Sequence, residues 1–412
     1  MQRLRFTKAE ISWILYDVGN SALVLLATSV IPIYFNALAA GDPAVEEVAV
    51  GAWGAAETIA SLIIALLMPV LGSIADMQGM RKRFIVGCVG TGAVATVAMG
   101  IPSHWLPFLV IYIISTVALN SSFVFYDAML VDATTDERMD EVSSNGYAWG
   151  YVGSCIPFVC CLLLVLNAEG LGLSMRTAML VSFVITAAWW VAFTIPLLKN
   201  VEQRSFKPRM PHALRNAVAG LAITCRSIWA NRSMRYYLCA YFFYIDGVHT
   251  IIKMATSYGS NLGIEGAQLI LALLVTQFVA CPASIVYGRL GRAFGTKRMI
   301  LVGICGYFFI TLFASLFLHT ATEFWILAIC VGLFQGGIQA LSRSEFGKLC
   351  PKNHANEYFG FFDIFGKYAA ILGTGLVSAF TFLTGNPSLG VLSISVLFIA
   401  GFALMLKVPE RS

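Results

Sequence analysis

The chain has 412 residues, of which 58% are hydrophobic and only 12% are charged. Soluble domains carry roughly 25% charged residues, so this composition excludes a soluble globular protein and predicts one that folds in a bilayer. The net charge of +5 comes from short basic clusters between apolar runs, a distribution typical of membrane proteins rather than of nucleic-acid-binding ones.

Twelve apolar runs are long enough to cross a membrane, since a spanning helix needs about 20 largely apolar residues. They lie at 11–38, 49–74, 83–101, 105–131, 143–167, 175–198, 235–258, 266–288, 298–318, 323–346, 357–383 and 388–407. The first run is too long for the apolar part of a signal peptide, so we expect an uncleaved first span. The sequence therefore predicts an all-α membrane protein with twelve transmembrane helices.

The placement of lysine and arginine predicts the orientation. If the N-terminus is cytoplasmic, 24 of the 27 basic residues fall on the cytoplasmic side, and only Arg176 faces outward. Lys253 and Lys367 lie within spans. We therefore expect both termini in the cytoplasm of a cell whose inner membrane holds the protein.

One long connection divides the spans into two sets of six. We expect an N-terminal half at 1–198, a basic linker with an amphipathic helix at 199–234, and a C-terminal half at 235–412. The halves share a loop pattern, because Gly288 follows Gly72 and Gly295 follows Gly79 by the same 216 residues. Such a parallel repeat of a six-span half is a transporter architecture.

The first of these loops resembles the G-x3-D-x2-G-x-R/K-x-R/K signature of the major facilitator superfamily. That resemblance implies a latch that holds the two halves in one conformation, and an ordinary positive-inside loop is the alternative. Arg292 stands in the second loop where the first has Asp76, so a latch there needs a different acidic partner. The latch residues that we expect are Gly72, Asp76, Gly79, Arg81 and Arg83, with Gly288, Gly295, Lys297 and Arg298 in the second loop.

A narrower resemblance covers almost the whole chain. The segments that carry it are SWILYDVGNS at 12–21, VFYDAML at 124–130, SSNGYAWGY at 143–151, YIDGVHTI at 244–251, QGGIQALSRS at 335–344 and FGF at 359–361. Together they resemble the vacuole effluxer-like family of major facilitators. The resemblance implies the major facilitator fold and transport, and its fungal members are implicated in releasing amino acids from the vacuole.

Polar side chains form stripes on four of the predicted spans, at helical spacing. An ionisable group inside a membrane costs roughly 2.5–3.5 kcal/mol on insertion scales, so it usually faces a cavity or a partner. In the major facilitator fold, spans 1, 4, 7 and 10 line the central cavity. The candidate residues for the solute or proton path are Asp17, Asn20, Glu57, Asn120, Asp127, Asp246, His249, Lys253, Gln335, Gln339 and Lys367.

Several of these residues have two interpretations. Asp17 and Asp246 are candidates to exchange a proton or bind a substrate amine, although Asp17 can also cap or pair locally. His249 is a proton relay or a packing residue, and Glu57 is a coupling carboxylate or is paired across the bundle. Lys367 is four residues from Asp363 and can form an intrahelical ion pair.

The sequence predicts a secondary active transporter that acts by alternating access, with protons as the coupling ion and an amino-acid-like metabolite as the solute. A multidrug/proton antiporter and a non-transporting sensor or scaffold are the alternatives. No nucleophile–base arrangement, GxxxxGKS or metal-ligand spacing occurs, so we expect no enzyme activity, no cofactor and no metal. The expected partners are the lipid bilayer, the solute and protons, and no nucleic acid. We expect the protein to be a monomer.

Overall fold

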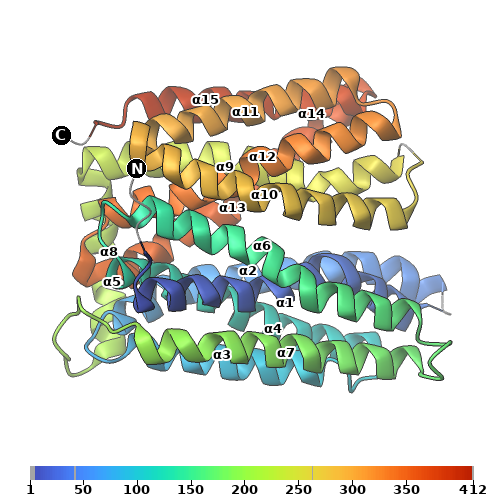
Figure 1. The fold of residues 1–412 in the computed structure, drawn as a ribbon, viewed down its shortest axis with the longest axis horizontal. Helices are drawn as coiled ribbons and strands as arrows, with labels where there is room; N and C mark the ends of the chain where they lie inside the picture. Colours follow the sequence, from blue (N-terminus) through green and yellow to red (C-terminus); the bar gives the residue numbers. More distant parts are fainter. Residues whose placement is uncertain (1–4, 41–42, 262, 411–412) are drawn as a thin grey trace. The chain divides into compact units, whose positions relative to one another are not determined.

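Long helices occupy the predicted apolar runs. The computed structural model describes residues 5–40, 43–261 and 263–410, which form helices joined by short connections (Figure 1). The helices are α1 Lys8–Ala39, α2 Pro43–Ala75, α3 Arg81–Ala98, α4 Trp105–Ala128, α5 Leu130–Ala133, α6 Met139–Leu166, α7 Met175–Asn200, α8 Ala213–Ala230, α9 Arg232–Asn261, α10 Gly266–Phe294, α11 Thr296–Phe317, α12 Ala321–Leu349, α13 Ala355–Thr384, α14 Pro387–Ser393 and α15 Ser395–Leu406, with a 3-10 turn at Lys352–His354.

Ten segments of the described chain are helical, long and apolar enough to cross a membrane. α4 and α5 together form one of them, as do α14 and α15. The two remaining predicted spans correspond to α3 and α9. α3 has 18 residues and opens with three basic ones, whereas α9 carries Asp246 and Lys253 in its apolar stretch. Both are helical, but they are less apolar than the other ten.

The chain forms two compact units that exchange short segments. Unit 1 comprises 1–133, 149–217 and 353–360, and unit 2 comprises 134–148, 218–352 and 361–412. The start of α13 therefore belongs to unit 1, while the start of α6 belongs to unit 2. Each unit consists of side-by-side helices together with the first turns of a helix that continues in the other unit.

Local chemistry sets several helix boundaries. The side chain of Thr7 accepts from the backbone of Glu10 at 3.2 Å, and Glu10 accepts from the backbone of Thr7 at 2.7 Å, which together form a capping box at the start of α1. Gly79 and Gly295 have φ values of +72° and +98°, in the region that glycine tolerates without strain. They lie in the α2–α3 and α10–α11 connections, so the repeated glycine has a positive φ in both although the two connections differ in length.

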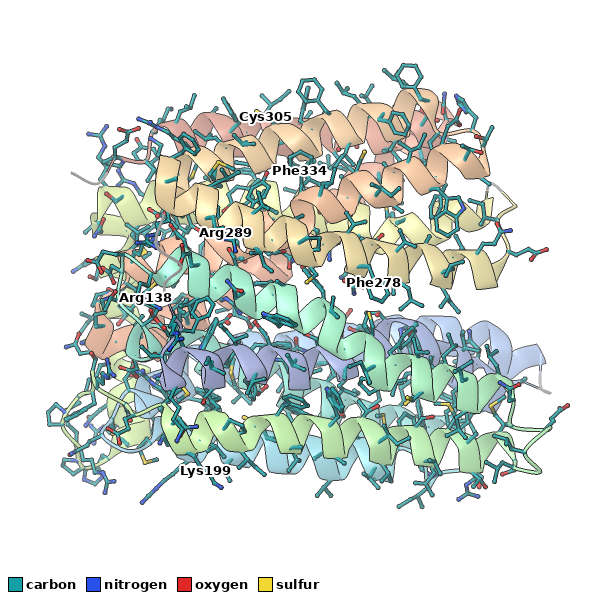
Figure 2. The ribbon with its side chains drawn as sticks, in the orientation of Figure 1. Arg138, Lys199, Phe278, Arg289, Cys305 and Phe334 are labelled. Carbon is teal, nitrogen blue, oxygen red and sulfur yellow. The ribbon has the colours of Figure 1, made fainter. Side chains whose placement is uncertain are left out.

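Aromatic side chains fill the interior of each unit, and apolar ones project outward. In unit 1, Trp13 stacks on Tyr126 with ring centroids 4.5 Å apart. In unit 2, Tyr241 stacks on Phe362 at 4.1 Å. Figure 2 shows Phe278 projecting from α10, and it is 56% exposed.

Two glycines of the repeated loops lie against the exchanged helix starts. A Cβ on Gly72 would lie 2.5 Å from the backbone oxygen of Asn356, at the start of α13. A Cβ on Gly288 would lie 2.6 Å from the Cβ of Ser144, near the start of α6. Only glycine permits either approach, because real Cβ atoms do not come this close to other atoms.

We predict that Gly72→Ala lowers the thermal unfolding temperature of the purified protein, because the backbone of α13 cannot yield to the added methyl group. Overpacking of this kind costs about 1–3 kcal/mol. Gly87→Ala in α3 is the matched control, since nothing lies within 4 Å of its Cβ position. Equal melting temperatures for the two variants would contradict the close contact of α2 with α13.

Candidate functional site

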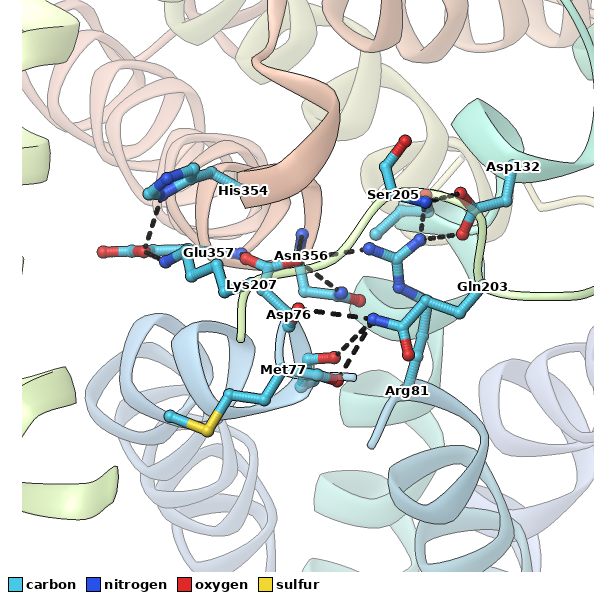
Figure 3. A network of polar contacts seen from close by, with 12 residues as sticks. Asp76, Met77, Arg81, Asp132, Gln203, Ser205, Lys207, His354, Asn356 and Glu357 are labelled. Atoms are coloured by element: carbon cyan, nitrogen blue, oxygen red, sulfur yellow. Dashed lines mark hydrogen bonds and ion pairs between the residues drawn. The ribbon is translucent and has the colours of Figure 1, made fainter. Parts of the chain in front are cut away.

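A buried arginine lies at the centre of a polar network in unit 1. Arg81, at the start of α3, has no exposed surface and pairs with two carboxylates (Figure 3). Its Nη2 lies 3.2 Å from Oδ1 of Asp76, and its Nη1 pairs with Asp132 at the end of α5. A buried charge is tolerated when it is paired and hydrogen-bonded, so these three residues stabilise one another.

The carboxylate of Asp76 also binds the first turn of α13. Its Oδ1 accepts from the backbone N of Asn356 at 2.9 Å and from Nδ2 of the same residue at 2.8 Å. Its Oδ2 accepts from the backbone N of Glu357 at 3.0 Å. The first amides of a helix lack internal partners and carry positive partial charge. Burial raises the pKa of Asp76, and Arg81 together with these donors opposes the rise.

The segment after α7 is bound into the same network. Gln203 donates to the backbone oxygens of Ala75 and Met77 at 3.3 and 3.2 Å, at the end of α2. Lys207 pairs with Glu357 at 2.7 Å, and its backbone N donates to the backbone O of Asp76 at 2.8 Å. The connection between the halves thus lies across the latch loop and contacts α13 (Figure 3). The sequence placed this segment in the basic linker 199–234 but did not predict these contacts, because an irregular loop has no periodic pattern.

Unit 2 contains a corresponding network, whose carboxylates Asp140 and Glu141 lie on the exchanged helix α6. Asp140, in the first turn of α6, accepts from Thr296 at 2.8 Å and from Lys348 at 2.7 Å, and it also accepts from Ser344. Arg292 of the second loop pairs with Glu141 at 3.1 Å. Here the carboxylates lie on the exchanged helix and the cations lie on unit 2 helices α10 and α12, as Glu357 of α13 pairs with Lys207 in unit 1, but Arg292 stands where unit 1 has Asp76.

Arg343 of α12 also holds the start of α6. Its Nε donates to Oγ of Ser143 and its Nη2 to the backbone O of Ser143, both at 3.0 Å. Its guanidinium lies 4.4 Å from the ring centroid of Tyr147, within cation–π range. Arg343 therefore anchors α6.

The other basic residues of the predicted latch have different positions. Arg83 is exposed. Lys297 donates to the backbone oxygens of Leu406 and Val408 at 3.1 and 2.6 Å, at the end of α15. Arg298 forms an exposed pair with Glu410 at 3.8 Å. The networks at the starts of α6 and α13 therefore involve Arg81, Gly72 and Gly288. They do not involve Arg83, Lys297 or Arg298.

The polar stripe of α1 packs against α6 inside unit 1. Asp17 and Asn20 are buried, and Nδ2 of Asn20 lies 3.4 Å from Oδ1 of Asp17. A Cβ on Gly150 of α6 would lie 3.2 Å from the backbone O of Asp17. On α4, Asn120 donates to the backbone of Thr116 at 2.8 Å, a local contact within the helix, while Asp127 is half-buried.

The polar stripe of α9 packs against α13 inside unit 2. Asp246 has no exposed surface, and its Oδ1 accepts from the backbone N of Gly373 at 2.9 Å and from Thr250 at 3.2 Å. Its Oδ2 is buried without a hydrogen-bond partner among the described residues. His249 is half-buried and hydrogen-bonds to the backbone of Gly366, whereas Lys253 is exposed.

Four predicted path residues remain. Gln335 and Gln339 are half-buried on α12. The side chain of Lys367 lies outside the described residues. Glu57 is exposed on α2, and its carboxylate accepts a hydrogen bond from the hydroxyl of Tyr112 on α4. In the described structure Glu57 thus has its partner within unit 1.

Comparison with known proteins identifies the class of protein. The proton:xylose symporter XylE has the same fold, with a TM-score of 0.74 at 11% identity over 98% of this chain and 95% of its own. The twelve-helix major facilitator fold predicted from the sequence is therefore confirmed, in two six-helix halves.

The family is shown by the sequence itself. The model of the family described as "Vacuole effluxer Atg22 like" matches residues 55–134 and 131–412. The uncharacterized MFS-type transporter YxiO of Bacillus subtilis (strain 168) is 45% identical over 99% of this chain and 96% of its own length. The chain belongs to the vacuole effluxer Atg22-like family of major facilitator transporters, which act on small solutes within the lipid bilayer and are not enzymes.

The fungal relatives are more distant. Autophagy-related protein 22-1 of Aspergillus niger is 25% identical over 65% of this chain, and the match spans 47% of its own length. About half of that fungal protein therefore has no counterpart in the matched region.

We predict that Asp76→Leu lowers the thermal unfolding temperature far more than Glu410→Gln does. Removing Asp76 leaves Arg81 and the first amides of α13 short of an acceptor, and breaking a buried ion pair costs about 3–5 kcal/mol. The exposed pair of Arg298 with Glu410 is worth about 0–1 kcal/mol. Similar melting temperatures for the two variants, measured in the same detergent, would contradict the role of Asp76.

Proposed function

We propose that this transporter moves a small zwitterionic metabolite, such as an amino acid, in exchange for or together with protons across the inner membrane. It acts as a monomer, and both termini lie in the cytoplasm. The observation that carries the proposal is the buried carboxyl group of Asp246, which has one oxygen bound and one without a described partner.

The surroundings of Asp246 suit a carboxyl group that gains and loses a proton. Its two described donors, Gly373 and Thr250, both bind Oδ1. A buried carboxylate whose second oxygen has no donor is costly, because nothing replaces the lost hydration of the charge. Protonation removes that charge, so this position favours proton uptake, whereas an approaching cation or water would favour release.

The contact of α9 with α13 links this proton to helix packing. A Cβ on Gly373 would lie 2.7 Å from Oδ1 of Asp246, so α13 comes close to the titrating group. The backbone amide of Gly373 is a better donor to a carboxylate than to a neutral carboxyl group. A change in the charge of Asp246 therefore changes the strength of the α9–α13 contact, which provides a route from proton binding to helix movement.

The networks at the starts of α13 and α6 supply the second part of the mechanism. Each unit binds the first turn of a helix that continues in the other unit, through Asp76 in unit 1 and through Asp140 in unit 2. Alternating access requires such contacts to break and form again. Charge-assisted hydrogen bonds to helix ends suit this task, because water can replace each donor and acceptor when they separate.

The polar stripes support a zwitterionic solute. Asp17 and Asn20 in unit 1, and Asp246 and His249 in unit 2, provide groups that bind an ammonium or a carboxylate on helices that are otherwise apolar. An amino acid is also the solute class that the fungal members of the family suggest.

We expect Asp246→Asn to abolish solute-driven proton movement while leaving the protein folded, because the amide keeps the shape but cannot exchange a proton. The solute is the amino acid that gives the largest thermal shift with purified protein, since a ligand stabilises what it binds. Proton flux is then recorded with a pH-sensitive dye in proteoliposomes. Glu265→Gln, at the exposed start of α10, is the matched control. Unchanged flux in Asp246→Asn would remove Asp246 from the coupling mechanism.

A further inference from the structure

A carboxylate and a group of aromatic rings lie together in unit 1, at the end remote from Asp76. The hydroxyl of Tyr112 donates to the carboxylate of Glu57. The ring centroids of Trp53 and Tyr112 lie 4.5 Å apart, and those of Phe35 and Trp53 lie 5.1 Å apart. The four side chains come from α1, α2 and α4. At about 1.5 Å per residue, Trp53 lies roughly 33 Å along α2 from its end at Ala75.

The exposure of these side chains distinguishes the group from core packing. Phe35 and Tyr112 are buried, at 1% and 3% exposed. Trp53 is half-buried and Glu57 is exposed. Two buried rings thus support an accessible aromatic ring and an accessible carboxylate, and the hydroxyl of Tyr112 fixes the position of that carboxylate.

The sequence around Glu57 makes its presence costly. Glu57 is the only ionisable side chain between Gly51 and Ala75, in a helix apolar enough to cross a membrane. An acid in such a segment is disfavoured by roughly 2.5–3.5 kcal/mol. One hydrogen bond from Tyr112 does not neutralise the charge. The group therefore has an uncompensated attraction for a cation.

We propose that Glu57, Trp53 and Tyr112 form a binding site for the ammonium group of an organic cation or zwitterion. The carboxylate supplies the opposite charge, and the face of Trp53 supplies cation–π attraction to the alkyl-ammonium surface. Glu57 would add a further group by which unit 1 recognises the solute of the proposed transporter, so this inference rests on that proposal. Asp246 lies in unit 2 and is a different site.

The surroundings favour an organic cation over a metal ion. Metal sites in proteins need several oxygen, nitrogen or sulfur ligands. No group of three or more His, Cys, Asp or Glu side chains within the described part of the chain could hold a metal. Glu57 is flanked by aromatic rings instead, which suits a large and weakly hydrated ammonium group.

The test compares choline with 3,3-dimethyl-1-butanol, which has the same shape with carbon in place of nitrogen. Binding of radiolabelled choline to the purified full chain is measured in detergent, with the neutral alcohol as competitor. We expect choline to bind, the alcohol not to compete, and Glu57→Gln to weaken binding by about tenfold or more, since the charge is lost. Glu169→Gln, an exposed carboxylate in the α6–α7 connection, is the matched control and is expected to bind as the wild type does.

A second series keeps the test decisive if Glu57→Gln does not fold. Trp53→Phe retains an aromatic face, whereas Trp53→Leu retains only apolar bulk. We expect Trp53→Leu to bind choline about tenfold more weakly than Trp53→Phe, as the size of a cation–π contact implies. Equal affinities in this pair, or competition by the neutral alcohol as strong as that by unlabelled choline, would overturn the proposal.

The outcome is separate from that for Asp246, because binding in detergent requires no transport. Absence of choline binding, together with loss of proton flux in Asp246→Asn, would remove the ammonium site and leave the coupling mechanism intact. Choline binding that depends on Glu57, with unchanged flux in Asp246→Asn, would support the ammonium site and remove Asp246 from the coupling mechanism.

Discussion

The buried guanidinium of Arg81 is the interaction on which unit 1 depends. It joins the end of α2, through Asp76, to the end of α5, through Asp132. Asp76 in turn binds the first amides of α13, and Asp132 accepts from the backbone N of Arg204 and Ser205 at 3.1 Å each. Without this cation, two buried carboxylates would lie side by side. One side chain therefore ties together two loops, the segment between the halves and an exchanged helix.

The two units bind their exchanged helices with different sets of charges. In unit 1 the loop acid Asp76 binds the helix N-terminus, and Glu357 of that helix pairs with Lys207. In unit 2 the acids Asp140 and Glu141 are on the exchanged helix, and Lys348 and Arg292 are their partners. Both arrangements place a carboxylate at the first turn of a helix, where the macrodipole favours it. A duplicated backbone can therefore keep its contact after the acid has moved to the other side.

The proposed proton site and the proposed ammonium site differ in the physical property that defines them. Asp246 is buried and its second oxygen has no described donor, which suits the proposed proton exchange. Glu57 is exposed and lies beside a hydroxyl and aromatic rings, which suits the proposed contact with an ammonium group. The same residue class thus serves two roles because burial and the neighbouring donors differ.

The sequence alone determined the class, the twelve helices and the repeated loops. These follow from local patterns: about 20 apolar residues make a span, and Gly72 with Gly79 recurs as Gly288 with Gly295. It also indicated that the second loop lacks an acid, although not that Asp140 and Glu141 supply it. Asp140 pairs with a residue 208 positions away, and no spacing rule reaches that far.

Only the tertiary structure decided which polar groups meet. Lys297 and Arg298 match the loop pattern, yet they bind at the end of α15 and at Glu410. Gln203 and Lys207 match no pattern, yet they hold the latch loop. Hydropathy depends only on residues that are adjacent in the sequence, so it can be read without knowledge of the fold. The partner of a charge is set by packing, because only folding brings a carboxylate and its donors within 3 Å.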